Sequence, residues 1–314
     1  MGSNHRPQRY YHHVVGSTAH RLFYCDHYAI PLPAGHKFPM AKYGVLRDLL
    51  AKEGCFRFES APCADPAVIE LAHDAAYVRG FLNGELPEAT MRRIGFPWSG
   101  ALVKRTLASV GGTLGATCDA FDSGWGGNLA GGTHHAFRAE GSGFCVFNDI
   151  AVAIQWLRAK GRIQRAAVID LDVHQGDGTA QFFETDPNVL TLSMHAKSNF
   201  PLRKQQSKID IEFADGTCDQ DYLSALAGVL PRVFEFEPDI VIYQSGVDPL
   251  AADTLGRLAL THAGLKERDR RVMAAARGSG IPIVITLGGG YARPIELTAE
   301  AHANTFLTAS EIFV

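Results

Sequence analysis

Hydrophobic and polar positions divide the chain into two alternating kinds of segment. Short apolar runs rich in branched residues predict strands at 22–25, 128–131, 166–171, 189–194, 240–243 and 281–287. Stretches with helical spacing lie between them, at 40–52, 99–121, 149–160, 221–236, 261–277 and 294–313, and Asp65 before Pro66 predicts another helix start. This order predicts an α/β fold with a mainly parallel central sheet and helices on both faces.

The pattern runs on without a segment that would separate domains. No internal repeat, low-complexity segment or long linker interrupts the chain. With 314 residues, of which 46% are hydrophobic, the chain can bury a large core. We predict a single catalytic domain over residues 21–314, preceded by an N-terminal extension over residues 1–20.

Charge and cysteine content exclude several classes of protein. The 30 basic and 33 acidic residues are mixed along the chain, which argues against a nucleic-acid partner. No apolar run approaches the roughly 20 residues of a membrane span, and the first residues lack a signal-peptide pattern. The six cysteines form no C-x-x-C pair, which suits reduced thiols. We expect a cytoplasmic protein without a membrane partner; the oligomeric state is left open.

Five polar clusters follow predicted strands directly. They are Gly-Gly-Thr-His-His (131–135), Asp-Leu-Asp-Val-His (170–174), Ser-Met-His (193–195), Ser-Gly-Val-Asp (245–248) and Gly-Gly-Gly-Tyr (288–291). The carboxyl ends of parallel strands share one edge of a sheet, and ligands bind in the crevice there. Five clusters at one edge predict a single functional site.

Asp172 and His174 are two residues apart at a strand end, so their side chains project to the same side. Asp248 can add a third ligand, and two carboxylates with one imidazole suit a divalent ion such as zinc. Taken alone, Asp-x-His is more often a helix cap beside a core histidine. The other clusters favour the metal site.

His134 and His135 are adjacent, and an imidazole needs a partner that fixes its tautomer. Asp170 and Asp177 bracket the metal pair and are available for this role. An imidazole held by a carboxylate can take a proton from water. A His-His pair alone is weak evidence for a catalytic role, because most such pairs are surface or core histidines. The glycines before this pair and the carboxylates after Leu171 and Gly176 strengthen the prediction.

Tyr291 follows three glycines, which allow unusual backbone angles, and a phenol beside a metal can donate to an oxyanion. A tight turn or a phosphate loop is the alternative, although no Walker lysine follows. Phe144 lies on a glycine-rich loop and can line an apolar channel that suits an aliphatic stem. For Phe147, a core position and a channel position are equally favoured.

Together, GGTHHAF (131–137), GSGFCVFNDIAVAI (141–154), VIDLDVHQGDGTA (168–180), SGVDPLAADTLG (245–256) and LGGGY (287–291) resemble the histone deacetylase superfamily. Order and spacing match from about residue 20 to the C-terminus. The resemblance implies an arginase-deacetylase fold and one catalytic Zn²⁺ or Fe²⁺.

The resemblance also implies roles for individual residues. Asp172, His174 and Asp248 would be metal ligands, and His134 and His135 would pair with Asp170 and Asp177. Tyr291 would polarise the substrate carbonyl, Phe144 would form one channel wall, and the Gly143 carbonyl would accept the substrate amide N–H. A structural K⁺ would be held by Asp170, Asp172, His174, Ser193 and Met194.

The segment D-L-D-V-H-Q-G (170–176) resembles class IV-type and bacterial deacetylase-like members. Gln175 follows His174 where many relatives have a second histidine. The stretch 80–98 is shorter than in acetylpolyamine amidohydrolases. The second channel wall is undefined, with Asn199, Phe200 and Pro201 as candidates, so acyl-chain length is left open.

We therefore predict a metal-dependent deacylase that acts most readily on acyl-lysine in a peptide or protein. The hypothesis is metal-activated water, His135 as general base and Tyr291 as oxyanion donor. One alternative is deacetylation of acetylpolyamines or another small acylated amine. Further alternatives are a two-manganese ureohydrolase of the arginase type and a non-catalytic relative that binds acyl ligands.

Overall fold

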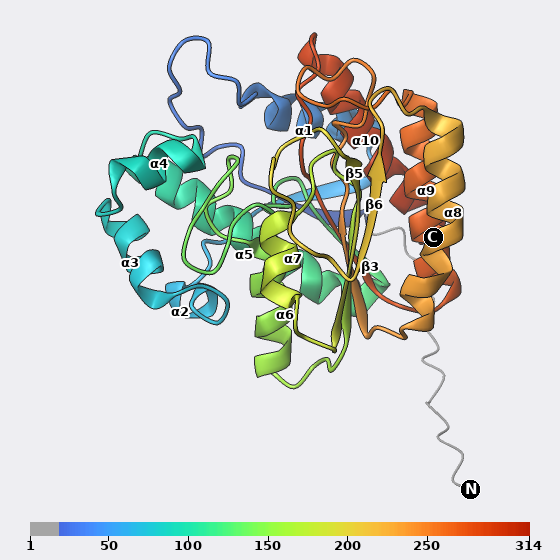
Figure 1. Ribbon diagram of the computed structural model, residues 1–314, viewed down its shortest axis with the longest axis horizontal. Coiled ribbons are helices and arrows are strands. Elements are labelled where there is room, and N and C mark those ends of the chain that lie inside the picture. The colour runs from blue at the N-terminus through green and yellow to red at the C-terminus, as the bar shows by residue number, and fades with distance from the viewer. Residues whose placement is uncertain (1–18) are drawn as a thin grey trace, which may run out of the picture.

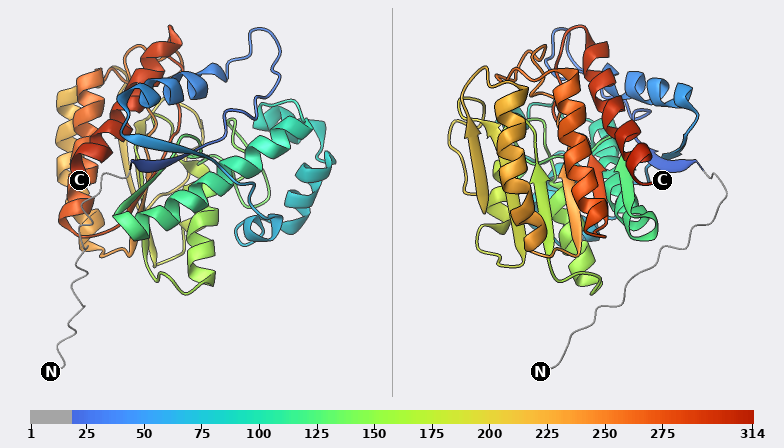
Figure 2. Two further views of the ribbon diagram at one scale, coloured as in Figure 1. Left: turned by 180° about the vertical axis from the view of Figure 1, so that it is seen from behind. Right: turned by 90° about the vertical axis from the view of Figure 1, so that its right-hand side faces the viewer.

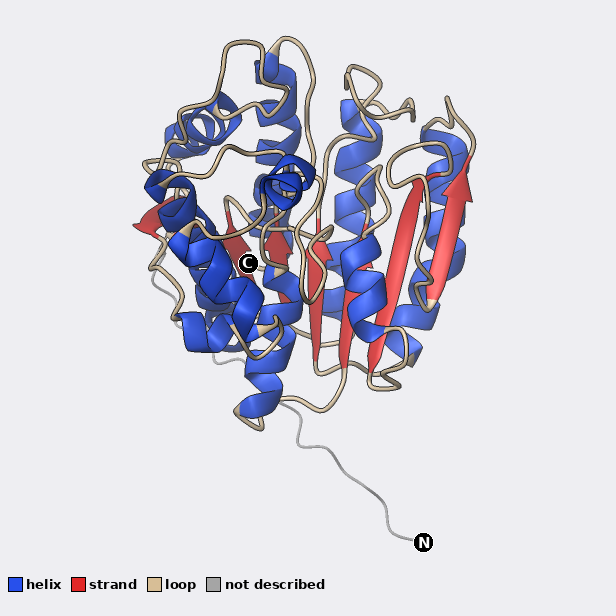
Figure 3. Ribbon diagram, turned by 60° about the vertical axis from the view of Figure 1, so that its left-hand side comes forward, coloured by secondary structure: helices blue, strands red, loops and turns tan. Residues whose placement is uncertain are grey.

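Eight parallel strands form one sheet in the order β2-β1-β3-β8-β7-β4-β5-β6. The structure is a computed structural model that describes residues 19–314. The strands are β1 His20–Tyr24, β2 Phe56–Ser60, β3 Trp125–Asn128, β4 Ala166–Asp170, β5 Val189–Ala196, β6 Ile209–Phe213, β7 Ile240–Gln244 and β8 Ile283–Thr286. All point the same way, so their carboxyl ends lie along one edge (Figure 3).

Helices cover both faces of the sheet. Figure 1 shows α5, α6 and α7 on one side and α8, α9 and α10 on the other, and Figure 2 shows the second layer face-on. The helices are α1 Ala41–Glu53, α2 Pro66–Ile69, α3 Ala75–Asn83, α4 Glu88–Ile94, α5 Gly100–Ser123, α6 Asp149–Ala159, α7 Asp177–Phe183, α8 Asp219–Glu235, α9 His262–Gly278 and α10 Ile295–Ile312. The fold class predicted from the sequence is confirmed. No helix of residues 19–314 has the length and apolar character needed to cross a membrane.

Short polar side chains set where the main helices begin. Ser99 accepts a hydrogen bond from the Leu102 amide at the start of α5, Asn148 accepts one from Ala151 at the start of α6, and Thr261 accepts one from Gly264 at the start of α9. Gly124, in the left-handed region with φ of 89°, ends α5.

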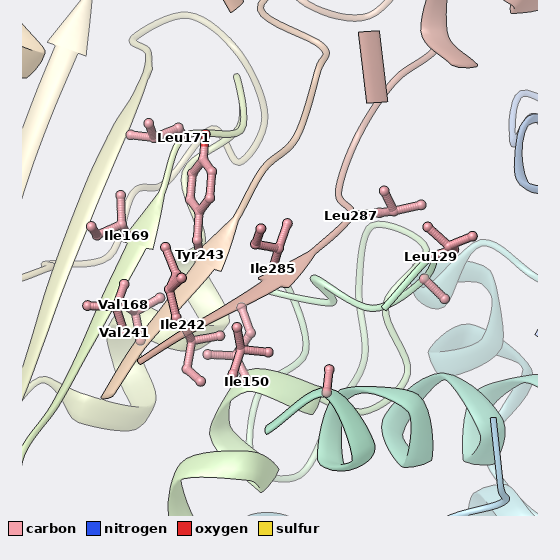
Figure 4. Packing of buried hydrophobic residues seen from close by; sticks show 14 of the residues in the cluster. Leu129, Ile150, Val168, Ile169, Leu171, Val241, Ile242, Tyr243, Ile285 and Leu287 are labelled. Carbon is pink, nitrogen blue, oxygen red and sulfur yellow. The ribbon is translucent and has the colours of Figure 1, made fainter. Parts of the chain in front are cut away.

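The core lies between the central strands and the two helix layers. Every residue of β4 and of β7 is buried, as expected for strands covered on both faces. Figure 4 shows their branched side chains, with Val168 and Ile169 beside Val241 and Ile242. This rigid centre supports the loops that leave its carboxyl edge.

Some predicted boundaries were wrong. The strand predicted at 128–131 is β3, Trp125–Asn128, because Gly131 and Gly132 have φ of 79° and 72° and cannot continue a strand. The edge strands β2 and β6 were missed, as were α3, α4 and α7. Residues 1–18 of the predicted extension lie outside the described residues, so its boundary at residue 20 stays a prediction.

Candidate metal centre

Loops from the carboxyl edge of the sheet enclose a cavity of about 90 Å³. Its lining combines polar residues of the predicted clusters with aromatic and aliphatic side chains. Among them are His134, His135, Gly143, Phe144, Asp172, His174 and Tyr291. Segments that are more than 150 residues apart in the sequence therefore meet at one site.

An acidic triad, Asp172, His174 and Asp248, lies at the floor of the site. One ligand atom of each residue lies within 4.8 Å of the others. Nδ1 of His174 is 3.0 Å from Oδ1 of Asp172 and 3.1 Å from Oδ2 of Asp248. Both carboxylates are buried, whereas the His174 side chain keeps 12% of its exposure. The three atoms thus face one small volume that can be reached from the cavity.

The remaining carboxylate oxygens of the triad are held by the surrounding chain. Oδ2 of Asp172 accepts hydrogen bonds from Nε2 of Gln244 at 2.9 Å and from the Gly289 amide at 2.7 Å. Oδ1 of Asp248 accepts one from the Val173 amide at 2.8 Å. Each carboxylate therefore has one oxygen fixed by the protein and one directed at His174.

The protonation of the triad reflects two carboxylates buried together. Burial and the neighbouring charge of Asp172 raise the pKa of Asp248 to about 7. Burial by itself would lower the pKa of His174, but its hydrogen bonds to Asp172 and Asp248 raise it to about 10. Negative charge is thus in excess at this position, which suits a bound cation.

The donor set fits a divalent transition metal. Two carboxylate oxygens and one imidazole nitrogen are a ligand set used by catalytic zinc sites, and three protein ligands leave a position for water and substrate. The triad is the one such cluster found among residues 19–314. That supports a one-metal centre over the two-manganese arrangement.

The tandem histidines are each held by a different aspartate. Nδ1 of His134 lies 2.7 Å from Asp170, and Nδ1 of His135 lies 2.6 Å from Asp177. The two rings lie 4.1 Å apart. The structure therefore contains both pairings that the family resemblance implied, and in each the Nδ1 contact leaves Nε2 for other partners.

The loop that carries these histidines is fixed by the first residue of α6. The Asp149 carboxylate accepts hydrogen bonds from the amides of Gly132 and Thr133, at 3.1 and 2.8 Å. A side chain on Gly132 would overlap the Leu287 carbonyl, so this position requires glycine. The histidine loop is thus packed directly against the loop that leads to Tyr291.

The two imidazoles differ in protonation. Burial opposes the charged form of His134, but the charges of Asp170 and Asp172 raise its pKa to about 9. Burial and the neighbouring charge of His134 lower the pKa of His135 to about 4, despite its hydrogen bond to Asp177. Adjacent histidines with similar partners are thereby driven to opposite forms.

Tyr291 lies across the cavity from the histidines. Burial and the nearby carboxylates of Asp248 and Asp172 raise the pKa of its phenol well above the usual range, so the hydroxyl remains a donor. The buried ammonium of Lys42 donates to the Gly288 carbonyl at 2.9 Å and lies 5.4 Å from the Tyr291 ring centre. The sequence analysis did not identify Lys42.

Two phenylalanines lie close to residues that line the cavity. Phe144 has φ of 65° and its ring centre lies 6.4 Å from that of Tyr291. Phe200, which is 43% exposed, meets His135 edge-on at 5.0 Å. Gly143 packs so closely on His135 that an added Cβ would lie 2.7 Å from the ring. Of the three candidates for the second wall, Phe200 is the one whose ring lies against His135, and its role as a wall stays a prediction.

The other two candidates hold Phe200 in place. Asn199 is buried, donating to the Leu255 carbonyl at 2.7 Å and accepting from the Arg257 amide at 3.0 Å. Pro201 is buried beside it. Phe147, for which core and channel positions were equally favoured, is 1% exposed and packs on Phe81 and also borders the cavity.

Of the residues predicted for potassium, Asp172 and His174 belong to the triad, and the other three lie on β4 and β5. Asp170 and Ser193 are paired neighbours on β4 and β5, and the Ser193 hydroxyl lies 2.9 Å from Nδ1 of His195. Met194 is buried on the same strand. Their role in binding K⁺ stays a prediction. Gln175, the departure from the common pattern, bonds to Gln205 and Asp210 instead of the triad.

Several supporting residues were missed by the sequence analysis. Gln244 bonds to Asp172 and to the Gly246 amide, and Arg268 on α9 donates to the carbonyls of Leu171 and Gly246. Gln244 lies between the strand predicted at 240–243 and the Ser-Gly-Val-Asp cluster, which is the one sequence feature that could have identified it. Arg268 lies in a run of charges that resembles an exposed helix face.

Comparison with known proteins gives relatives over most of the chain. The histone deacetylase domain family matches residues 36–306. The chain is 42% identical to an uncharacterised protein of Picosynechococcus sp., covering 93% of this chain and 99% of that one. It is 33% identical to histone deacetylase 2 of Arabidopsis thaliana, covering 82% of this chain and 70% of that one. It is also 34% identical to histone deacetylase RPD3 of Saccharomyces cerevisiae over 52% of this chain and 39% of that one.

Proposed function

This chain belongs to the histone deacetylase family, and we propose that it is a metal-dependent amidohydrolase that removes acyl groups from amines, with acyl-lysine as the substrate class. One observation carries the proposal. Asp172 and His174 of the acidic triad line the same small cavity as two aspartate-held imidazoles and a protonated phenol, and Asp248 completes the triad beside them.

Asp172, His174 and Asp248 would hold the ion, with zinc first and Fe²⁺ second among the candidates. When bound there, the ion supplies a Lewis acid that acidifies water and polarises the substrate carbonyl. The carboxylate oxygens fixed by Gln244, Gly289 and Val173 keep the ligands oriented.

His135 is the proposed general base. Asp177 holds its Nδ1, which leaves Nε2 with the lone pair that takes a proton from the attacking water. His134, held by Asp170, is placed to return a proton to the leaving amine. Tyr291 donates its phenol hydrogen to the developing oxyanion. The Gly143 carbonyl is the proposed acceptor for the substrate amide N–H.

The mouth of the cavity favours an acyl group on an aliphatic stem. Phe144 and Phe200 are the proposed aromatic sides of this mouth, and a narrow apolar passage would suit the four methylene groups of lysine. A small acylated amine is the second substrate class. It would use the same triad and histidines, so substrate comparison separates the two.

The test is turnover by protein reconstituted with Zn²⁺ or Fe²⁺, using acyl-lysine peptides from acetyl to myristoyl and acetylated polyamines. A chelated sample and an Asp248→Asn variant serve as controls. Metal-dependent release from the peptides supports the proposal, and release from polyamines alone moves the substrate class to small amines. Absence of release from every compound, with bound metal confirmed, would overturn the amidohydrolase proposal.

A further inference from the structure

The loop that follows Asp248 returns to the backbone of Tyr291. Oδ2 of Asp253 accepts a hydrogen bond from the Tyr291 amide at 2.6 Å. Oδ1 of the same carboxylate accepts from the amides of Leu255 and Gly256, both at 2.8 Å. Asp253 therefore ties the turn of its own loop to the amide of the tyrosine.

The next residue holds the other polar group of the Tyr291 backbone. The Thr254 hydroxyl donates to the Tyr291 carbonyl at 2.7 Å. Two consecutive residues thus bind both the amide and the carbonyl of one residue on a different loop. Such a pair fixes the position of the Cα atom, from which the phenol projects.

The backbone before Tyr291 gives a reason for this anchoring. Gly288, Gly289 and Gly290 have no side chains with which to pack, and Gly290 has φ of 153°. An added Cβ at Gly290 would lie 2.6 Å from Thr298 and 2.9 Å from Val247, so the close packing excludes side chains there. A glycine tract is conformationally permissive, so the tyrosine needs external contacts to keep one position.

We propose that Asp253 and Thr254 are positioning residues that hold the Tyr291 phenol at the site where the oxyanion forms. The inference rests on the proposed function, because it concerns the donor used in that reaction. The loop that begins at the proposed metal ligand Asp248 also carries Asp253 and Thr254. Its two ends are packed together, because Gly256 lies against the backbone carbonyl of Asp248. A displaced donor loses its hydrogen bond to the transition state and little of its contact with bound substrate.

The test compares Thr254→Val, Thr254→Ser and Tyr291→Phe, alone and combined, using the best acyl-lysine peptide. Loss of one neutral hydrogen bond predicts that Thr254→Val lowers kcat about threefold to tenfold, with KM unchanged. Thr254→Ser restores the rate. In the Tyr291→Phe background, Thr254→Val has no further effect, because the two residues act through one hydroxyl.

A matched control is Thr217→Val. Thr217 is partly exposed and donates to the Ala214 carbonyl at 2.8 Å, far from Tyr291 in the chain, so the substitution removes a similar bond. We expect its rate to match that of the wild type. Equal loss from Thr254→Val with and without the Tyr291 hydroxyl would refute the positioning role.

A second readout does not need turnover. ¹⁹F NMR of the intact protein with 3-fluorotyrosine at position 291 should give one sharp resonance in the wild type and in Thr254→Ser. Thr254→Val should broaden or split it, and Thr217→Val should not. A sharp, unshifted resonance in Thr254→Val would overturn the inference, and wild-type protein inactive on every substrate would overturn only the proposed function.

Discussion

The acidic triad and a second buried ionic cluster, around Arg268, lie close together at the carboxyl ends of β4 and β7, and they differ in charge balance. The Arg268 cluster consists of Arg268, Asp269, Tyr243 and Thr305. The Asp269 carboxylate accepts from the guanidinium at 2.8 Å and from the two hydroxyls, at 2.5 and 2.6 Å. Its two charges cancel within the cluster.

The acidic triad has no such balance. Asp172 and Asp248 share the His174 imidazole, and the only other basic side chain within 4.0 Å of their oxygens among the described residues is His134, whose Nε2 lies 4.0 Å from Oδ1 of Asp172. Arg268 lies close to the same strand ends, but its NH1 group donates to the carbonyls of Leu171 and Gly246 and not to the triad carboxylates. A buried pair that cancels supports the fold, whereas buried charge of one sign in excess marks a place for an external ion.

The largest effect is expected from breaking the balanced cluster. Arg268→Ala leaves Asp269 buried without its cation and should lower the free energy of unfolding by about 3–5 kcal/mol. Urea denaturation followed by circular dichroism measures it. The control is Lys266→Ala. Lys266 lies on the same helix as Arg268, and its substitution removes an exposed ion pair with Glu311 of α10. A loss below about 1 kcal/mol for Arg268→Ala would contradict the assigned role.

The second effect concerns activity and leaves stability unchanged. Tyr291→Phe removes the oxyanion donor and should reduce kcat by about 10²–10³-fold, or about 2.7–4 kcal/mol. Steady-state kinetics on the preferred acyl-lysine peptide measures it, with the urea midpoint as control. A near wild-type rate would exclude the phenol from the reaction.

The third effect tests whether the triad takes up a cation. Zn²⁺ at a free concentration of 100 times its Kd should stabilise the folded protein by about 2.7 kcal/mol. Asp248→Asn should lose most of this gain, since it removes one of the three ligands. Thermal denaturation of both proteins with and without the ion gives the comparison, and equal stabilisation of the two would place the ion elsewhere.

The smallest effect is expected from Glu267, whose ion pairs with Arg270 and Arg271 are partly exposed and lie on the same helix as the buried Arg268–Asp269 pair. Hydrogen bonds from Arg270 and Arg271 lower the pKa of Glu267 to about 2, from an ordinary value of 4.5. The stability that the Glu267 ion pairs add to the folded protein is therefore fully present above about pH 4.5 and is lost as the pH falls toward 2. At pH 7, Glu267→Gln should cost less than about 1 kcal/mol, because solvent screens the pair.

Denaturation curves between pH 7 and 2 check this prediction. The difference between wild type and Glu267→Gln should shrink below pH 4.5 and vanish near pH 2. A difference that grows on acidification would have the wrong sign for a lowered pKa. Glu311→Gln, at the exposed pair with Lys266, is a control for general charge removal.

The sequence predicted the centre of the sheet better than its edges. Central strands such as β4 and β7 are buried on both faces and appear as continuous apolar runs, which a sequence search detects. The edge strands β2 and β6 are as long as β4 and β7 but alternate between apolar and polar residues, as in FRFES and IDIEF, and a five-residue alternation is a weak signal. The shifted β3 shows a related weakness, because Trp-Gly-Gly-Asn lacks branched residues.

The candidate site was predicted as a set of residues but not as a supported structure. Residues at strand ends, such as Asp172 and Asp248, could be brought together from the parallel topology alone. Arg268 and Asp253 could not, because the partners that connect them to the site are backbone groups of distant residues, such as the Gly246 carbonyl and the Tyr291 amide. Every residue has a backbone carbonyl, so the sequence does not mark that of Gly246 as a partner. Only the fold shows which side chain binds it.

The segment between β5 and β6 carries Phe200, which packs on His135 and is the proposed second wall, but neither a triad residue nor a tandem histidine nor Tyr291. One proposed side of the entrance is therefore encoded apart from the reacting groups, whereas Phe144 follows the histidine loop directly. Substitution of Phe200 should change its own side of the entrance while the hydrogen bonds that hold His134, His135 and Asp172 are kept. Evolution, or a protein engineer exchanging this loop, has a route to new substrates that leaves the hydrolytic machinery in place.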